Sequence, residues 1–148
     1  MSTSTSNTAK YLSYTAAWDR INQAQANGYS FEVVTLCEGI ISDRLLSFVL
    51  GVDPDSGVSE RTPFDKLIRL WGSNVSPPPL TEQGDDLITK VDEWRKQRNT
   101  VLHGMVKSMP TQPTEAVASF TQRATDAATE GICLAKAVQS WHKKQLPK

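Results

Sequence analysis

The chain has 148 residues, of which 39% are hydrophobic, and its 16 basic side chains are balanced by 16 acidic ones. This length and composition fit one soluble domain with a sizeable core, and the zero net charge excludes a broadly basic surface that binds nucleic acid non-specifically. No apolar run approaches the roughly 20 residues of a membrane-spanning helix. The Ser/Thr-rich residues 1–8 lack the apolar core of a signal peptide and are expected to fray. We therefore expect a cytoplasmic protein with no membrane partner.

The first two helices are predicted from apolar residues that repeat every three or four positions. One is expected over 9–26 and is stopped by the left-handed conformation that Asn27-Gly28 favours. Its apolar stripe consists of Tyr11, Tyr14, Trp18 and Ile21. The next is expected over 30–50 with Ser30 as its cap. Its apolar face is wide, which predicts a central, well-covered helix.

Three further helices follow. A short one is expected to begin with Thr62 as its cap and Pro63 as its first residue. After the extended run of prolines 77–79, a fourth is expected over 82–107. Thr114 is expected to cap a fifth, with Glu115 in its first turn. The apolar stripe of that helix contains small residues that permit close approach of a neighbour, and comprises Val117, Phe120, Ala124, Ala127, Gly131, Leu134, Val138 and Trp141.

No segment alternates with the period of two that marks a strand, and no internal repeat is present. The expected fold is therefore all-α, an up-and-down bundle of four long helices and one short helix in a single domain over 9–146. The four tryptophans occupy apolar helical positions and are expected in the core.

Four other residues carry separate expectations. Cys37 and Cys133 lie in apolar helical patterns and are expected to be reduced core thiols, with a disulfide between them as the alternative. They are too few for a zinc site, and no cofactor motif is present. Arg44 is expected to serve structural pairing or a dimer contact. His142 precedes two lysines and is expected to be exposed.

The fourth helix carries an unusual polar string. Arg98 falls in the middle of an apolar stripe formed by Leu87, Val91, Trp94, Val101, Leu102 and Met105. A charge there is costly unless it is paired, for example with Glu38 on the second helix, or lies at a cleft or interface. Asn99 and His103 are four positions apart and therefore neighbours on the adjoining face.

Arg98 and His103 lie roughly 140° apart around an ideal helix. They can converge on one ligand only if the helix deforms, if it ends near Gly104, or if a second copy of the chain contributes. Glycine weakens a helix interior, which favours the first two routes.

Arg98, Asn99 and, after three further residues, His103, late in a helix of a small bundle, resemble the signature of the HEPN superfamily. Glu38 resembles the acid in the middle of that family's long second helix, and the resemblance spans roughly residues 31–141. It implies an up-and-down bundle of four to five helices. It also implies a homodimeric, metal-independent endoribonuclease without a cofactor, acting as a toxin or phage-defence effector, with the site helix at the dimer interface.

The resemblance also implies roles for the residues. His103 would act as general acid or base, Arg98 would bind the phosphate, and Asn99 would orient the phosphate or the imidazole. Glu38 and Arg95 would support the site, although the alternative for Arg95, with Lys96 and Lys107, is a solvated charged face. One subgroup has a Tyr two residues after the His, where a partner nucleotidyltransferase modifies it. This chain has Met105 there, so that modification is not expected.

Alternatives remain open at this stage. The same family contains non-catalytic regulators and binding modules, and a similar string occurs in helical regulators related to the mannitol operon repressor. In that case Arg98 would be a buried structural residue and His103 a surface residue favoured by the end of its helix. An unrelated helical bundle is the third reading. The partners expected for the ribonuclease are RNA (tRNA or mRNA), a second copy, and an antitoxin or regulatory protein.

Overall fold

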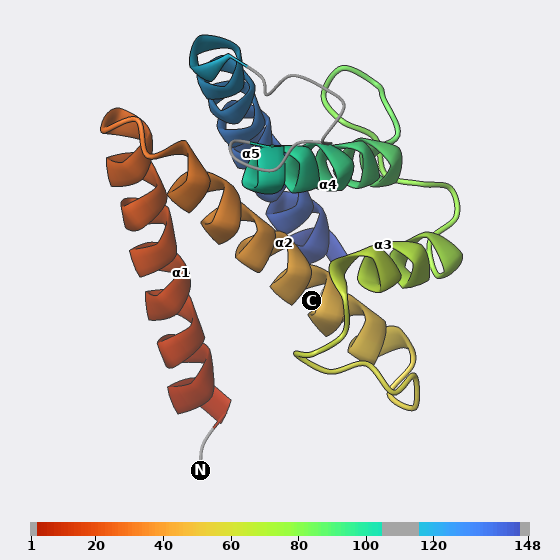
Figure 1. Cartoon of the computed structure of the whole chain (residues 1–148). Helices are drawn as coiled ribbons and strands as arrows, with labels where there is room; N and C mark the ends of the chain where they lie inside the picture. Colours follow the sequence, from red (N-terminus) through yellow and green to blue (C-terminus); the bar gives the residue numbers. More distant parts are fainter. Residues whose placement is uncertain (1–2, 105–115, 146–148) are drawn as a thin grey trace.

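The structure, a computed structural model, describes residues 3–104 and 116–145. Within these ranges the chain forms α1 (Thr3–Ala26), α2 (Ser30–Val52), α3 (Phe64–Ser73), α4 (Leu87–Gly104) and α5 (Val117–Gln145), as Figure 1 shows. The same ranges contain no strand, and their one β-bridge joins Leu80 and Asp86. The predicted all-α bundle with four long helices and one short helix is confirmed. Among the described residues, no helix combines the length and apolarity needed to cross a membrane.

The second helix is the centre of the molecule, as its wide apolar face predicted. It contacts α1, α3 and α5. Figure 1 shows α2 running between α1 on one side and α3 on the other, with α5 crossing behind it. Its buried side chains are Val33, Val34, Cys37, Ile40, Ile41, Leu45 and Val49. Gly28 adopts a φ of 75° in the turn before α2, as the predicted stop requires.

A close contact joins α4 and α5. The buried indole of Trp94 lies against Gly131, where an added Cβ would come within 2.7 Å of the ring. The indole N–H donates a hydrogen bond to the carbonyl oxygen of Ala127 at 2.8 Å. The expectation that small residues of α5 admit a neighbouring helix is thus confirmed, and the neighbour is α4.

The helix starts differ from those expected. The first helix begins at Thr3, so residues 3–8, expected to fray, are helical. The third begins at Phe64 with Pro63 in the cap position, because Pro63 keeps an extended ψ of 148°. Thr62 caps nothing and instead accepts a hydrogen bond from the Ser59 N–H.

The fourth helix begins at Leu87 and not at residue 82. A turn closed by the Gly84 N–H on the Thr81 carbonyl precedes it. The Asp86 carboxylate then accepts hydrogen bonds from the N–H groups of Ile88 and Thr89, which is how an acidic cap starts a helix. The expected end at Lys107, and the cap formed by Thr114 and Glu115, lie outside the described residues.

Five exposure predictions were wrong, and one of them concerns Leu102 of the apolar stripe of α4, which is 36% exposed. Tyr11 is 70% exposed, because α1 contacts the bundle only through the edge that carries Tyr14, Trp18 and Ile21. Val117, at the start of α5, is also largely exposed. Cys133 is exposed, whereas Cys37 is buried as expected, and both thiols are free. His142 is only 5% exposed, because α5 continues to Gln145 and turns the imidazole inward.

Candidate functional site

Arg98 is held by the second helix. Its Nη2 lies 2.6 Å from Glu38 Oε1, and the side chains are 18% and 28% exposed respectively. The contact is an ion pair without the geometry of a hydrogen bond, and the buried Arg98 Nε has no hydrogen-bond partner among the described residues. The guanidinium also lies 5.9 Å from the centre of the Phe64 ring. Arg98 is therefore anchored between α2, α3 and α4 but is not fully satisfied.

The apolar patterns of the two helices explain this pairing. On α4, Arg98 lies one turn from buried Trp94 and Val101, so it is carried inward with them. On α2, Glu38 lies one turn from buried Val34 and Ile41. The two charges thus meet where the apolar faces of their helices meet, and each offsets the cost of burying the other.

Asn99 and His103 lie elsewhere on α4. Both are exposed, and α4 is helical from Leu87 through Gly104. No distortion of the described helix brings His103 to the Arg98 side, so the two residues stay on different faces of one chain. Asn99 and His103 do share a face, since they are one turn apart. Of the three routes to convergence, deformation within the helix is the one that this geometry removes.

Two cations beside the motif have a partner on their own helix. Arg95 Nε lies 3.0 Å from Asp92 Oδ1, and Lys96 Nζ lies 3.7 Å from Asp92 Oδ2. Among the described residues, the partner of Arg95 is Asp92 rather than Arg98 or Glu38. Met105 and Lys107 lie outside the described residues.

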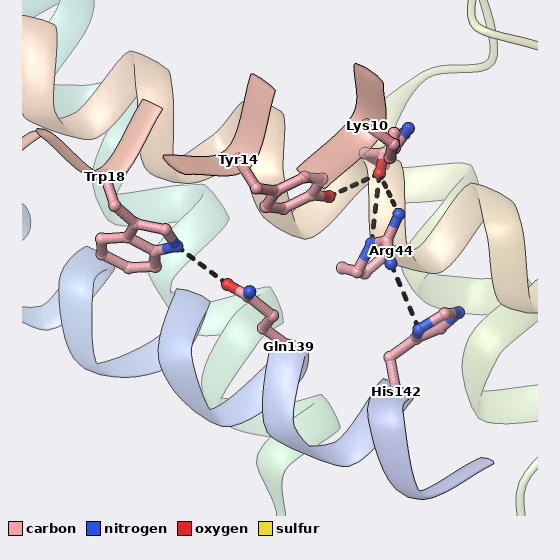
Figure 2. Close-up of polar contacts among 7 residues, drawn as sticks. Lys10, Tyr14, Trp18, Arg44, Gln139 and His142 are labelled. Atoms are coloured by element: carbon pink, nitrogen blue, oxygen red, sulfur yellow. Dashed lines mark hydrogen bonds and ion pairs between the residues drawn. The ribbon is translucent and has the colours of Figure 1, made fainter. Parts of the chain in front are cut away.

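A second polar cluster joins three helices. Structural pairing was one of the two uses expected for Arg44, and it is observed here, whereas the other members of the cluster were not predicted. Asp43 on α2 accepts hydrogen bonds from Lys10 (2.6 Å) and Tyr14 on α1, and from its neighbour Arg44 (2.6 and 3.1 Å). Arg44 Nη1 also lies 3.4 Å from Nδ1 of His142 on α5. Figure 2 shows Tyr14 and Lys10 approaching Arg44 from one side and His142 approaching it from the other.

The cluster perturbs the acidity of its members. Burial and the hydrogen bond to Asp43 raise the pKa of Tyr14 well above its ordinary value. Burial would raise the pKa of Asp43, but the hydrogen bonds from Lys10, Tyr14 and Arg44 outweigh it and lower that pKa. Burial and then the charge of Arg44 lower the pKa of His142, against a smaller opposing effect of Asp43. His142 is therefore neutral at neutral pH.

A surface groove of about 300 Å³ runs beside this cluster, between α1 and α2. Its walls combine apolar and polar side chains, contributed by Lys10, Ser13, Tyr14, Ala17, Thr35, Leu36, Gly39, Ile40 and Asp43. At the next level along α1, the Trp18 indole donates a hydrogen bond to Gln139 of α5 at 2.9 Å. The groove marks a stretch where α1 and α2 lie side by side without close packing.

The sequence contained one signal for this cluster. His142 follows Ala135 and Val138 at intervals of three and four, which places it on the buried stripe of α5. The two lysines that follow His142 instead favoured the prediction of an exposed tail. The contacts of Asp43 with α1 had no local signal, since Tyr14 and Asp43 are 29 positions apart.

Within residues 3–104 and 116–145, no three His, Cys, Asp or Glu side chains lie close enough together to be candidate metal ligands. Comparison with protein-family models, with curated proteins and with solved structures found no match to this chain.

Proposed function

We propose that this chain is a metal-independent endoribonuclease of the HEPN type, acting as a cytoplasmic homodimer in a toxin or phage-defence system. The observation that carries the proposal is the arrangement on α4: an arginine anchored by Glu38, and an exposed Asn99–His103 pair one turn apart. The buried Arg98 Nε, which has no hydrogen-bond partner among the described residues, is a further sign that this arginine is not explained by its ion pair alone.

The proposed chemistry needs only these groups. The RNA 2′-hydroxyl attacks the adjacent phosphorus while a base accepts its proton, and the 5′-oxygen leaves with a proton from an acid. The products are a cyclic phosphate and a 5′-hydroxyl, so no water is consumed in this step. A histidine serves as acid or base near neutral pH, and an arginine fork stabilises the charge that develops on the phosphate.

A second copy is part of the proposal because Arg98 and His103 do not converge within the described part of α4. Arg98 and His103 lie on different faces of a regular helix. Two chains that meet along α4 about a two-fold axis can present the Arg98 of one and the His103 of the other to the same phosphate. The zero net charge fits a small cleft that selects exposed RNA, such as tRNA loops or mRNA, rather than a surface that binds any nucleic acid.

The test is cleavage of single-stranded RNA and of tRNA in the presence of a chelator. We expect the wild type to release fragments with cyclic phosphate and 5′-hydroxyl ends. His103→Ala and Arg98→Ala should each reduce the rate by about 10²–10⁴-fold, the usual contribution of acid–base catalysis. Arg69→Ala, on the exposed face of α3, is the matched control and should keep the wild-type rate. Equal rates in all four proteins would exclude these residues as the site.

Mixing the two inactive variants tests the composite cleft. A hybrid of Arg98→Ala and His103→Ala chains retains one intact arginine and one intact histidine. If both chains line one cleft, the mixture should regain part of the activity that neither variant has alone. No recovery, together with a monomeric mass in solution, would contradict the dimeric site.

A second candidate is a non-catalytic regulatory or partner-binding module of the same fold. The Glu38–Arg98 ion pair favours it, because that pair, resting against Phe64, also suits a purely structural role. This candidate predicts no cleavage by the wild type, and an Arg98→Ala variant that is impaired only in stability.

A further inference from the structure

The cluster around Asp43 is arranged so that Arg44 is its central residue. Arg44 binds Asp43 through Nη2 and Nε, its guanidinium covers the Tyr14 ring at 4.8 Å from the ring centre, and its Nη1 faces His142. Arg44 therefore touches α1 and α5 at once, and its side chain is only 17% exposed. Arg44 thus links His142 to the contacts of α1.

The contact between Arg44 and His142 depends on protonation. A guanidinium only donates hydrogen bonds, so the contact is attractive only while Nδ1 of His142 keeps its lone pair. The neutral imidazole then carries its proton on Nε2. When both ring nitrogens are protonated, a donor faces a donor and a cation faces a cation, between an imidazole that is 5% exposed and a guanidinium side chain that is 17% exposed.

The cluster already holds more positive than negative charge before His142 is protonated. Arg44 contacts His142, and the charge of Asp43 also acts on it. Lys10 and Tyr14 of α1 bind Asp43, and Lys143 and Lys144 follow His142 on α5. One carboxylate already faces two permanent cations there. Protonation of His142 would add a third positive charge, and burial and Arg44 accordingly hold its pKa below the ordinary value.

His142 cannot easily leave the site, whereas α1 can. The adjacent Trp141 is packed against Phe48 and Trp71, with ring centres 4.8 and 5.3 Å apart, which anchors the last turns of α5. In α1, by contrast, Tyr11 and Leu12 are 70% and 59% exposed, and a groove lined by Lys10 and Ser13 runs between this part of the helix and α2. Elements with few buried apolar contacts are the first to open.

We propose that Lys10, Tyr14, Asp43, Arg44 and His142 form a proton-operated latch, in which protonation of His142 displaces Arg44 and releases the N-terminal half of α1 from α2. The rest of the bundle stays folded, since Ile21 and Ala24 of α1 and the cores of α2–α5 are buried independently of the latch. The proposal does not depend on ribonuclease activity. Its trigger is mild acidification.

The test is hydrogen exchange of the whole chain at about pH 7.5 and about pH 5.5, on either side of the ordinary histidine pKa. Protection is corrected for the intrinsic effect of pH on exchange. In the wild type we expect a several-fold loss of protection at residues 10–18 on acidification, with α2 and α4 unchanged. His142→Gln should remove this pH dependence. His103→Gln should retain it, and it is a matched control because the chain has only these two histidines.

A second variant and an NMR titration test the same proposal. Asp43→Asn removes the anchor and should leave residues 10–18 poorly protected at both pH values. If His142→Gln does not fold, NMR titration of the wild type replaces it, and the α1 amide shifts must follow the titration of His142 rather than that of His103. Protection of α1 that is independent of pH in the wild type, or a loss confined to the last turn of α5, would overturn the proposal.

Discussion

At the scale of single residues, two partly buried ion pairs show how charged side chains are accommodated in this chain. Arg98 and Glu38 each replace an apolar residue on their helices and meet at 2.6 Å. Arg44 and Asp43 are neighbours on α2 and pair at 2.6 Å at the junction with α1. In both cases the cost of removing a charge from water is offset by an opposite charge at short range, so that loss of one partner is more harmful than loss of both.

The Glu38–Arg98 pair makes this testable. Arg98→Ala leaves a mostly buried carboxylate without its cation and should lower the free energy of unfolding by about 1–3 kcal/mol. The double variant Glu38→Ala/Arg98→Ala should lose less than the sum of the two single variants, because the second change removes the unpaired charge. Urea unfolding of the four proteins measures both quantities. Strictly additive losses would show that the pair contributes nothing as a pair.

At the scale of helices, the contact between α4 and α5 sets how closely α4 approaches the rest of the bundle. Gly131 leaves room for the Trp94 ring, and the indole N–H is satisfied by the Ala127 carbonyl. The position of Arg98, one turn beyond Trp94, follows from this contact. A change of spacing here would shift Arg98 relative to Glu38.

Two glycine substitutions separate packing from helix propensity. Gly131→Ala would place a methyl group 2.7 Å from the buried Trp94 ring and should destabilise the protein by about 1–3 kcal/mol through overpacking. Gly39→Ala, in the middle of α2 with open space at its Cβ, should stabilise it by about 0.5–1 kcal/mol. Thermal unfolding of both variants beside the wild type is the measurement. Equal effects of the same sign would contradict the close α4–α5 contact.

At the scale of the whole molecule, the pH dependence of stability follows from the signs of two pKa shifts. The pKa of His142 is lowered by folding, so its contribution is present above about 6.5, the ordinary histidine value, and is lost as the pH falls below it. The pKa of Asp43 is lowered from 3.8, so its contribution disappears only in stronger acid, as the pH falls below that value.

We therefore expect acid destabilisation in two separate steps. Urea unfolding followed over a pH series should show the free energy of unfolding fall first below about pH 6.5, where histidine begins to titrate. His142→Gln should flatten this first step and leave the second, more acidic one. A free energy that stays constant down to the carboxylate range would mean that His142 is as easily protonated in the folded chain as in the unfolded one.

The sequence predicted those features of the fold that repeat locally. Periodic apolar residues indicated five helices and most of their buried faces, and Arg98 stood out because it interrupts such a stripe. The pairing of Arg98 with Glu38 was among the expectations for the same reason. Tyr11, by contrast, belongs to the apolar stripe of α1 but is exposed. Periodicity shows which face of a helix is apolar but not how much of its length a neighbouring helix covers.

The parts that could not be predicted depend on distant pairs. The contact of Arg44 with His142 spans 98 positions, and nothing local marks it. Arg98 and His103 lie on different faces of a regular helix, so their position in the sequence of α4 does not bring them together. The predicted first residue of α4 was wrong because the Asp86 carboxylate caps the helix and so determines where it begins.

The two cysteines differ in exposure, so the wild-type protein can be labelled selectively at one of them. Burial raises the pKa of the Cys37 thiol to about 12, so this group carries almost no thiolate at neutral pH, whereas Cys133 is exposed on α5. Thiol reagents act on accessible thiolates and should therefore select Cys133. Because α5 contacts both α2 and α4, a fluorophore or spin label attached there reports on the centre of the bundle without any engineered cysteine. The wild-type chain can thus be labelled at one defined position on α5.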